Sequence, residues 1–138
     1  MPFYQCQTPE GLLNEAQRAK LANEITRIHC EMTGAPKMFV HVAFTEAKRG
    51  TCYSGGEISK VSIVNASWRA GRPVELKQAF LKTVAQMWAR ETRTDVKDVL
   101  VAITELPAEN AFEFGQILPN PNQDREWLTQ HGFAKAPT

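Results

Sequence analysis

The sequence predicts an α/β (α+β) fold in which duplicated β-α-β units form a four-stranded, mainly parallel sheet with two helices on one face. Three observations lead to this prediction. Strand-like apolar stretches alternate with helix-like stretches of period three and four. The segments Val42–Glu46 (VAFTE) and Val101–Glu105 (VAITE) match position by position, as two copies of one unit would. A length of 138 residues, 43% of them hydrophobic, suits one domain with a packed core.

The duplication sets the predicted domain organisation. We expect a single domain over residues 1–138, with internal repeats at about 2–47 and 57–107 and an irregular C-terminal tail at 108–138. The alignment that places Val42 on Val101 also matches positions on the two predicted helices, where Leu21 falls on Phe80. Each strand-helix-strand connection is expected to be parallel and right-handed.

The first unit begins with a strand over residues 2–7, which Thr8, Pro9 and Gly11 close with a turn. A helix follows, with Asn14 as N-cap and Gln17 three residues later. Its apolar positions recur at intervals of four, three and four: Leu21, Ile25, Ile28 and Met32. Gly34 and Pro36 end the helix, and the apolar run 38–45 predicts a strand covered on at least one face.

The second unit follows an exposed polar connection over residues 48–56. A longer strand is predicted over 58–68, and Pro73 suits the first turn of the next helix because it lacks an N–H group. The apolar face of that helix is formed by Leu76, Phe80, Val84 and Met87. A last strand is predicted over 99–106. Prolines and asparagines then indicate an irregular tail with a short helix around 124–128.

Charge and cysteine content exclude several classes of protein. Lys and Arg total 16 against 15 Asp and Glu, and they are scattered, so a nucleic-acid partner is not expected. No run reaches the roughly 18 to 20 apolar residues that cross a bilayer, and the N-terminus does not resemble a signal peptide. We therefore expect a cytoplasmic protein without a membrane partner. Its three widely spaced cysteines are expected to be free, mostly buried thiols, with no metal site and no cofactor.

The predicted sheet has helices on only one face. An apolar sheet face that the chain itself leaves bare is normally covered by other subunits, so the fold predicts a homo-oligomer.

Pro2 is the first candidate for chemistry. Methionine before a small residue is normally removed, which leaves a prolyl secondary amine at the chain terminus. Burial beside cationic groups would lower the pKa of such an amine from its reference value near 8 and make it a general base. Taken alone, the proline is better explained as a residue that resists further trimming and starts a strand.

Arg69 and Arg72 lie at a predicted strand end and helix start, in the segment WRAGRP. Two guanidinium groups beside the free N–H groups of a helix N-terminus form a natural site for a carboxylate. The alternative is a pair of solvated loop arginines.

His29 and Glu113 are two further candidates. His29 is next to the apolar stripe of the first helix, where it is either a structural residue or a hydrogen-bonding group that faces a cleft. Glu113 stands between Phe112 and Phe114. An apolar environment favours the protonated form of a carboxyl group, which makes Glu113 a candidate acid or base, or else a rim carboxylate between core aromatics.

Together these residues resemble the cis-3-chloroacrylic acid dehalogenase group of the tautomerase superfamily. The resemblance extends from Pro2 to about Trp127. It is carried in order by Pro2, the motifs ITxxH (25–29), APK (35–37), RxGR (69–72), ITExP (103–107) and ExG (113–115).

The resemblance implies a tautomerase fold and a homotrimer, with Pro2 as the catalytic amine. It also implies that Arg69 and Arg72 bind the substrate carboxylate, that His29 assists this binding and that Glu113 activates water. One position departs from the family, because Ala102 stands where its dehalogenases have a tyrosine that acts with the glutamate.

The sequence therefore predicts a cofactor-independent enzyme for small unsaturated or 2-oxo carboxylic acids. Keto–enol tautomerase activity is expected, with hydratase or dehalogenase activity dependent on a substitute for the missing phenol, for which Tyr4 and Tyr53 are the candidates. Pro2 acts as a base if its amine is neutral and as an acid if it is protonated. The alternatives are a malonate semialdehyde decarboxylase-like enzyme and a non-catalytic binding protein similar to macrophage migration inhibitory factor.

Overall fold

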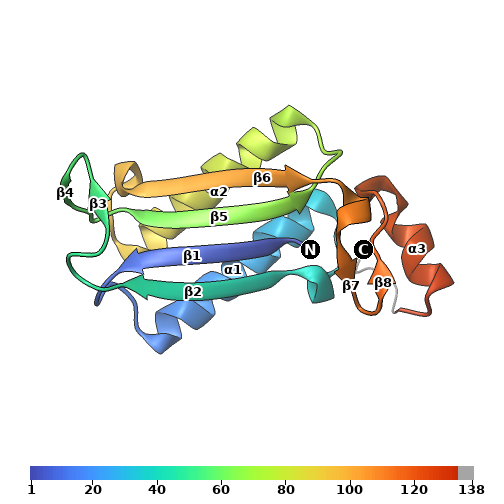
Figure 1. Ribbon diagram of the computed structural model, residues 1–138, viewed down its shortest axis with the longest axis horizontal. Coiled ribbons are helices and arrows are strands. Elements are labelled where there is room, and N and C mark those ends of the chain that lie inside the picture. The colour runs from blue at the N-terminus through green and yellow to red at the C-terminus, as the bar shows by residue number, and fades with distance from the viewer. Residues whose placement is uncertain (134–138) are drawn as a thin grey trace.

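The structure is a computed structural model that describes residues 1–133, so residues 134–138 of the predicted domain and tail lie outside the described residues. Six elements form its two main layers (Figure 1). They are β1 (Phe3–Pro9), α1 (Glu15–Thr33), β2 (His41–Ala47), β5 (Ser62–Arg69), α2 (Val74–Thr92) and β6 (Val99–Leu106). The smaller elements are β3 (Tyr53–Ser54), β4 (Glu57–Ile58), β7 (Phe112–Glu113), β8 (Gln116–Ile117) and α3 (Asp124–Gln130).

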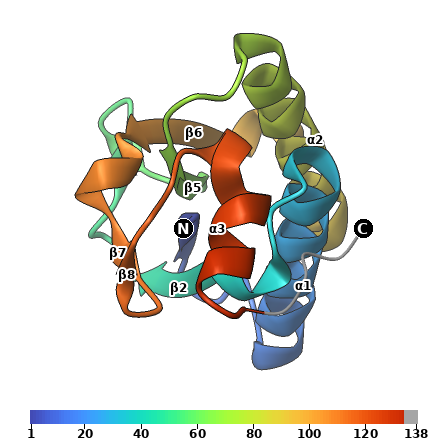
Figure 2. The same cartoon turned by 90° about the vertical axis from the view of Figure 1, so that its right-hand side faces the viewer.

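The main sheet has the strand order β2-β1-β5-β6. The strands β1 and β2 are parallel, as are β5 and β6, while the two units meet through the antiparallel pair β1 and β5. Both long helices cover one face of this sheet (Figures 1 and 2). The predicted fold is confirmed, and the sheet is mixed because its two parallel halves run in opposite directions.

The repeat extends beyond the strands and helices that predicted it. In the alignment that places Val42 on Val101, helix α2 begins and ends at the same positions as α1, with Val74 on Glu15 and Thr92 on Thr33. The hairpin β7–β8 falls on the hairpin β3–β4 in the same alignment. Each unit therefore ends in a two-stranded hairpin, and the two hairpins lie at opposite ends of the main sheet (Figure 1).

Four predicted boundaries were wrong. The first strand, expected over 2–7 with Thr8 and Pro9 in a turn, continues to Pro9, and both residues pair with β2. The strand expected from Ile58 begins at Ser62, because Gly55 and Gly56 turn the chain at φ angles of 59° and 84° and put Ile58 in the hairpin. The strand expected from residue 38 begins at His41, after a 3-10 turn over 37–39. Pro73 precedes α2 as its N-cap instead of lying in its first turn.

The predicted start of α1 is confirmed in detail. Asn14 accepts a hydrogen bond from the backbone of Gln17, and the Gln17 side chain accepts one from the backbone of Asn14, which completes a capping box. Gly34 ends the helix in the left-handed conformation at φ 74°. The predicted strand 99–106 and the short helix near 124 also form.

The main core lies between the helices and the sheet, and residues of the C-terminal segment form a second core around Phe39. The opposite face of the sheet is not covered by residues 1–133. It is less apolar than expected, because its central hollow is lined by polar as well as apolar side chains: Gln5, Gln7, Ala43, Thr45, Ile63 and Asn65. In the described part of the chain, every helix is too short or too polar to cross a membrane.

Candidate active site

The N-terminus lies at the end of the sheet where the C-terminal segment folds over (Figures 1 and 2). Pro2 is buried directly before β1, and its carbonyl accepts a hydrogen bond from the backbone N–H of His41 at 3.1 Å. Beside it is an open cavity of about 470 Å³ that is lined by Met1, Phe3, His41, Leu106, Asn110, Ala111, Phe112 and Glu113. Met1 and Phe3, on either side of the buried Pro2, thus line a hollow instead of projecting into solvent.

Glu113 is in β7 and faces the chain terminus. Its carboxylate makes an ion pair with the Met1 amino group and a second short contact with Nε2 of His41. The environment differs from the expected apolar one, because Phe112 is 69% exposed and Phe114 is 42% exposed. The Met1 amino group and the His41 ring, not enclosing aromatic rings, therefore hold Glu113 in position.

His29 is buried on the sheet side of α1, with 1% of its surface exposed. Its Nδ1 lies 2.6 Å from the hydroxyl of Tyr4, and the indole N–H of Trp68 donates to the same hydroxyl at 2.9 Å. Burial, and secondarily the charges of Arg72 and Arg69, lower the pKa of His29 to about 3. The ring is therefore neutral at physiological pH.

Arg69 ends β5 and is 3% exposed. Its Nη1 donates to Oδ1 of Asp124 at 2.7 Å and to the carbonyl of Pro119 at 2.7 Å, and its Nη2 donates to Oδ2 of Asp124 at 2.9 Å. Both terminal nitrogens are thus occupied by the C-terminal segment. A substrate carboxylate that binds them must share them with Asp124 or displace it.

Arg72 lies in the loop between β5 and α2. Its Nη1 donates to the carbonyl of Thr33, near the C-terminal end of α1, at 3.3 Å, and its guanidinium carbon lies 5.8 Å from the ring centre of Trp68. Burial first and the charge of Arg69 second lower the pKa of Arg72. Gly71 permits this approach of the loop, because it adopts φ 118°, a conformation that side chains rarely adopt.

The effects of neighbouring charges on pKa values indicate that the candidate residues and the chain terminus lie near one another. The pKa of the Met1 amine is lowered mainly by burial; Glu113 and Asp124 act to raise it, and Arg69 acts to lower it. The positive N-terminus in turn contributes to the low pKa of His29. Residues predicted from separate segments of the sequence therefore meet at one end of the sheet.

Three residues of this region were missed by sequence reasoning. Asp124 has a single sequence signal, its place at the start of a short helix, and that signal favours a capping role. His41 begins β2 with no motif around it. The sequence offers Tyr4 only as a substitute phenol for Glu113, whereas in the structure its hydroxyl is buried and hydrogen-bonded to His29 and Trp68.

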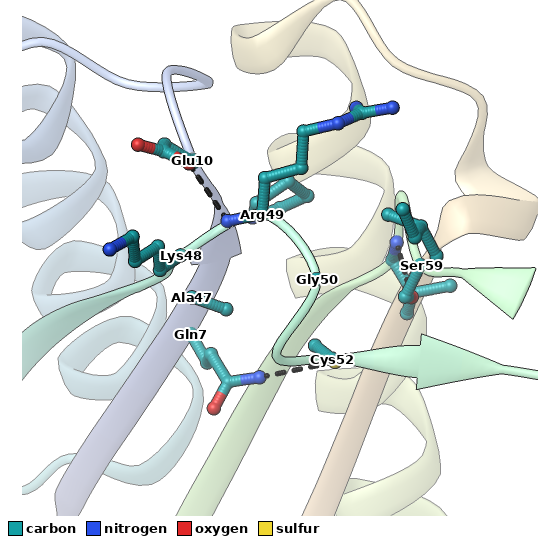
Figure 3. Close-up of a pocket in the computed structure, with 11 residues that line it drawn as sticks. Gln7, Glu10, Ala47, Lys48, Arg49, Gly50, Cys52 and Ser59 are labelled. Atoms are coloured by element: carbon teal, nitrogen blue, oxygen red, sulfur yellow. Dashed lines mark hydrogen bonds between the residues drawn. The ribbon is translucent and has the colours of Figure 1, made fainter.

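The opposite end of the sheet holds the repeat counterpart of this region. There a cavity of about 270 Å³ is lined by residues of β1, the β2–β3 connection and the segment after β4 (Figure 3). Gln7 contacts Sγ of Cys52 at 3.5 Å, and Glu10 accepts from the backbone of Arg49 at 2.8 Å. The repeat counterpart of Pro2 is Val61, an internal residue, so this end has no terminal amine. Tyr53 lies here as well, far from Glu113 within one chain.

The side chains of the site are not arranged as metal ligands. In the part of the chain described, no group of three or more His, Cys, Asp or Glu side chains is placed to hold a metal ion. The groups that the site itself offers for chemistry are an amine, carboxylates, guanidinium groups and a neutral imidazole.

Residues 1–131 match the family model Tautomerase_3, described as "Putative oxalocrotonate tautomerase enzyme". A probable tautomerase of Lactococcus lactis is 38% identical over 60 residues, which are 44% of this chain and 97% of that protein. This relative is about half as long as the present chain, and nearly its whole length is matched. Such a match is expected if the present chain contains two copies of one unit.

Two solved structures resemble the whole fold. A member of the cis-3-chloroacrylic acid dehalogenase family is 27% identical with a TM-score of 0.89, covering 92% of this chain and 90% of its own. A fused 4-OT, described as a symmetric trimer, is 23% identical with a TM-score of 0.78, covering 84% and 94% respectively.

Proposed function

This chain belongs to the Tautomerase_3 family and is a tautomerase-type enzyme, and from that premise we propose that it interconverts keto and enol forms of small 2-oxo carboxylic acids through the amine of Pro2. One observation carries the proposal. The chain terminus, Glu113, His29 and the two arginines come together from different elements around one end of the sheet.

Removal of Met1 turns the Pro2 nitrogen into the reactive group. That nitrogen lies within one residue, about 4 Å, of the amine that contacts Glu113. Burial lowers the pKa of the Met1 amine, and a Pro2 amine in the same surroundings is expected to follow the same direction. These surroundings favour a neutral amine, and hence a general base, over a permanently protonated acid.

We assign the binding of the substrate carboxylate to Arg72 and His29, while Arg69 acts through its charge. Arg72 uses one hydrogen bond to Thr33, so most of its five N–H donors remain for an anion. Arg69 supplies positive charge, while its terminal nitrogens are held by Asp124. We predict that Arg69 binds substrate directly only where the incoming carboxylate replaces Asp124.

The reaction then proceeds in two proton transfers. The Pro2 nitrogen takes the hydrogen of the enol hydroxyl, and the C–O bond becomes a carbonyl as the C=C electrons move toward C3. The protonated amine returns the hydrogen to C3, which restores the free base. Guanidinium and imidazole N–H groups stabilise the negative charge that develops between these steps. No cofactor is needed for such a transfer.

A second candidate activity is the addition of water to an unsaturated acid, which includes cis-3-chloroacrylate. The contact between Glu113 and His41 favours it, because His41 provides the carboxylate with a polar partner that Ala102 does not. We expect His41→Phe to abolish water addition while leaving tautomerisation within about twofold. Equal loss of the two activities would contradict this division of roles.

We also propose that the enzyme is a cytoplasmic homotrimer. The uncovered sheet face supports an oligomer, and a related fold is described as a symmetric trimer. Sedimentation equilibrium of the full chain is expected to give three times the mass of 15.5 kDa.

The proposed function is tested by controlling the chain terminus. The full chain is made with a cleavable N-terminal tag, so that one preparation yields acylated Pro2 before cleavage and free Pro2 after it. Turnover of phenylenolpyruvate is expected only after cleavage, with intact mass confirming the terminus. Pro2→Ala should lose at least 100-fold in kcat/KM, whereas Pro9→Ala, at the far end of β1, should remain within twofold.

Other outcomes identify the alternatives. Full activity of the tagged chain would contradict the amine mechanism. Release of carbon dioxide from a 3-oxo acid, with no tautomerisation, would indicate malonate semialdehyde decarboxylase-like chemistry. Absence of turnover with every small acid, in a properly cleaved and folded chain, would favour a binding role similar to that of macrophage migration inhibitory factor.

A further inference from the structure

The imidazole of His29 has two nitrogens in different surroundings. Nδ1 is 2.6 Å from the Tyr4 hydroxyl. Nε2 is buried, and among the described residues it has no hydrogen-bond partner. A buried polar atom without a partner is uncommon in folded proteins and calls for an explanation. The explanation begins with the question of which of the two nitrogens carries the hydrogen.

The hydrogen-bond donors fix these positions. The indole nitrogen of Trp68 is a donor only, so the Tyr4 oxygen accepts from it at 2.9 Å. The single hydroxyl hydrogen of Tyr4 is then directed to Nδ1 of His29, the second group within hydrogen-bonding distance. A neutral imidazole carries one hydrogen, and because Nδ1 accepts, that hydrogen is on Nε2.

The reverse arrangement is less favourable. If Nδ1 carried the hydrogen, the Tyr4 oxygen would accept from both His29 and Trp68, and its own hydroxyl hydrogen would have no acceptor. Tyr4 is fully buried, so water cannot take that hydrogen. The reverse arrangement thus leaves two buried groups unpaired, the Tyr4 hydroxyl hydrogen and the Nε2 acceptor, whereas the chain Trp68 to Tyr4 to His29 leaves only the Nε2–H group without a partner among the described residues.

We propose that Tyr4 and Trp68 are positioning residues that hold His29 as its Nε2–H tautomer, which donates a hydrogen bond to the substrate carboxylate beside Arg72. This inference rests on the proposed function for the identity of the acceptor. It assigns Tyr4 and Trp68 roles that do not require either to touch the substrate.

Trp68 links the two groups that bind the anion. Its ring lies 5.1 Å from that of His29 at an interplanar angle of 88°, while the Arg72 guanidinium lies 5.8 Å from its centre. One rigid indole is therefore packed against the imidazole on one side and the guanidinium on another. Phe80 packs against the rings of Tyr4, His29 and Trp68 and limits their movement.

The tautomer is read directly by nitrogen NMR of the free, folded enzyme with labelled histidine. We expect the His29 ring to show a hydrogen on Nε2 in the wild type, and a mixture of tautomers in Tyr4→Phe, which removes only the hydroxyl. Trp68→Phe should likewise produce a mixture, because Tyr4 then becomes free to accept from Nδ1. Tyr53→Phe changes the other tyrosine of the chain and should match the wild type.

Kinetics test the link to the substrate. Tyr4→Phe is expected to raise KM for phenylenolpyruvate about tenfold, the effect of one hydrogen bond to a charged group, with a smaller change in kcat. KM for the methyl ester of the same acid should remain within twofold, since it carries no carboxylate. A purely structural role for Tyr4 would alter the two substrates equally.

The outcomes separate this inference from the proposed function. A wild-type ring with its hydrogen on Nδ1, or a Tyr4→Phe ring identical to the wild type, would overturn the tautomer assignment whatever the turnover. Correct tautomers with unchanged KM would overturn the carboxylate contact. If the free enzyme shows the expected tautomers but turns over no acid, the proposed function fails while the positioning role of Tyr4 and Trp68 stands.

Discussion

Asp124 holds the guanidinium of Arg69 through two hydrogen bonds, of 2.7 and 2.9 Å, although the two residues are remote in the chain. The pair attaches α3 to the end of β5, directly beside the chain terminus. Arg69 is almost fully buried, so its charge depends on this carboxylate for compensation. The C-terminal segment is thus a structural part of the active-site region.

Removing the charge of Asp124 is expected to destabilise the fold. Asp124→Asn should lower the free energy of unfolding by about 3 kcal/mol, because a buried guanidinium is left without its counter-ion. Urea unfolding at a fixed protein concentration measures this change. Glu126→Gln removes an exposed acid from the same helix and should cost less than about 0.5 kcal/mol. Equal effects of the two variants would refute the buried pair.

Stability is expected to depend on pH through His29. In the folded chain burial lowers the pKa of His29 to about 3, against an ordinary value of 6.5. Between these values the unfolded chain binds a proton that the folded chain does not, so stability falls as pH falls below about 6.5. The free energy of unfolding should drop by about 1.4 kcal/mol per pH unit from this group.

Urea titrations at pH 7, 6 and 5 check this dependence. The difference between wild type and His29→Gln should shrink as the pH falls. A difference that is constant over this range would contradict a neutral, buried His29.

The pH dependence of turnover is expected to report the pKa of the Pro2 amine. If Pro2 is a base, kcat/KM rises with pH through the amine pKa, which burial is expected to hold below the reference value of 8.0. Glu113 acts to raise the pKa of the terminal amine. Glu113→Gln should therefore move the rising limb to lower pH. A falling limb assigned to Pro2 would mean that it acts as an acid.

The two helix ends offer a test of backbone strain. Gly34 ends α1 at φ 74°, and Arg93, its counterpart in the second repeat, ends α2 at φ 55°. A left-handed conformation costs a residue with a side chain about 1 kcal/mol relative to glycine. Arg93→Gly should raise the free energy of unfolding by about that amount, and Gly34→Ala should lower it similarly, because a Cβ at Gly34 meets no atom within 4 Å. Thermal melts of the two variants that shift in the same direction would contradict this.

Local sequence signals predicted the elements of the fold well. Asn14 and Gln17 located the start of α1, and the matching pentapeptides beginning at Val42 and Val101 located the two outer strands of the sheet. These signals work because capping and alternation are set by residues close together in the chain. The prediction failed at Ile58. This apolar residue indicated the start of a long strand, but the turn at Gly55 and Gly56 places it in a hairpin.

The amino-acid pattern alone was enough to predict the duplicated fold and to name Pro2, His29, Arg69, Arg72 and Glu113 as candidates. Their partners became visible only in the folded chain. Packing joins segments that are remote in the sequence, and it brings Asp124 to Arg69, His41 to Glu113 and Tyr4 to His29. Hydrogen bonds and ion pairs act over a few ångströms, a distance that only folding establishes. The fold therefore controls which guanidinium remains available to an anion and which imidazole nitrogen carries the hydrogen.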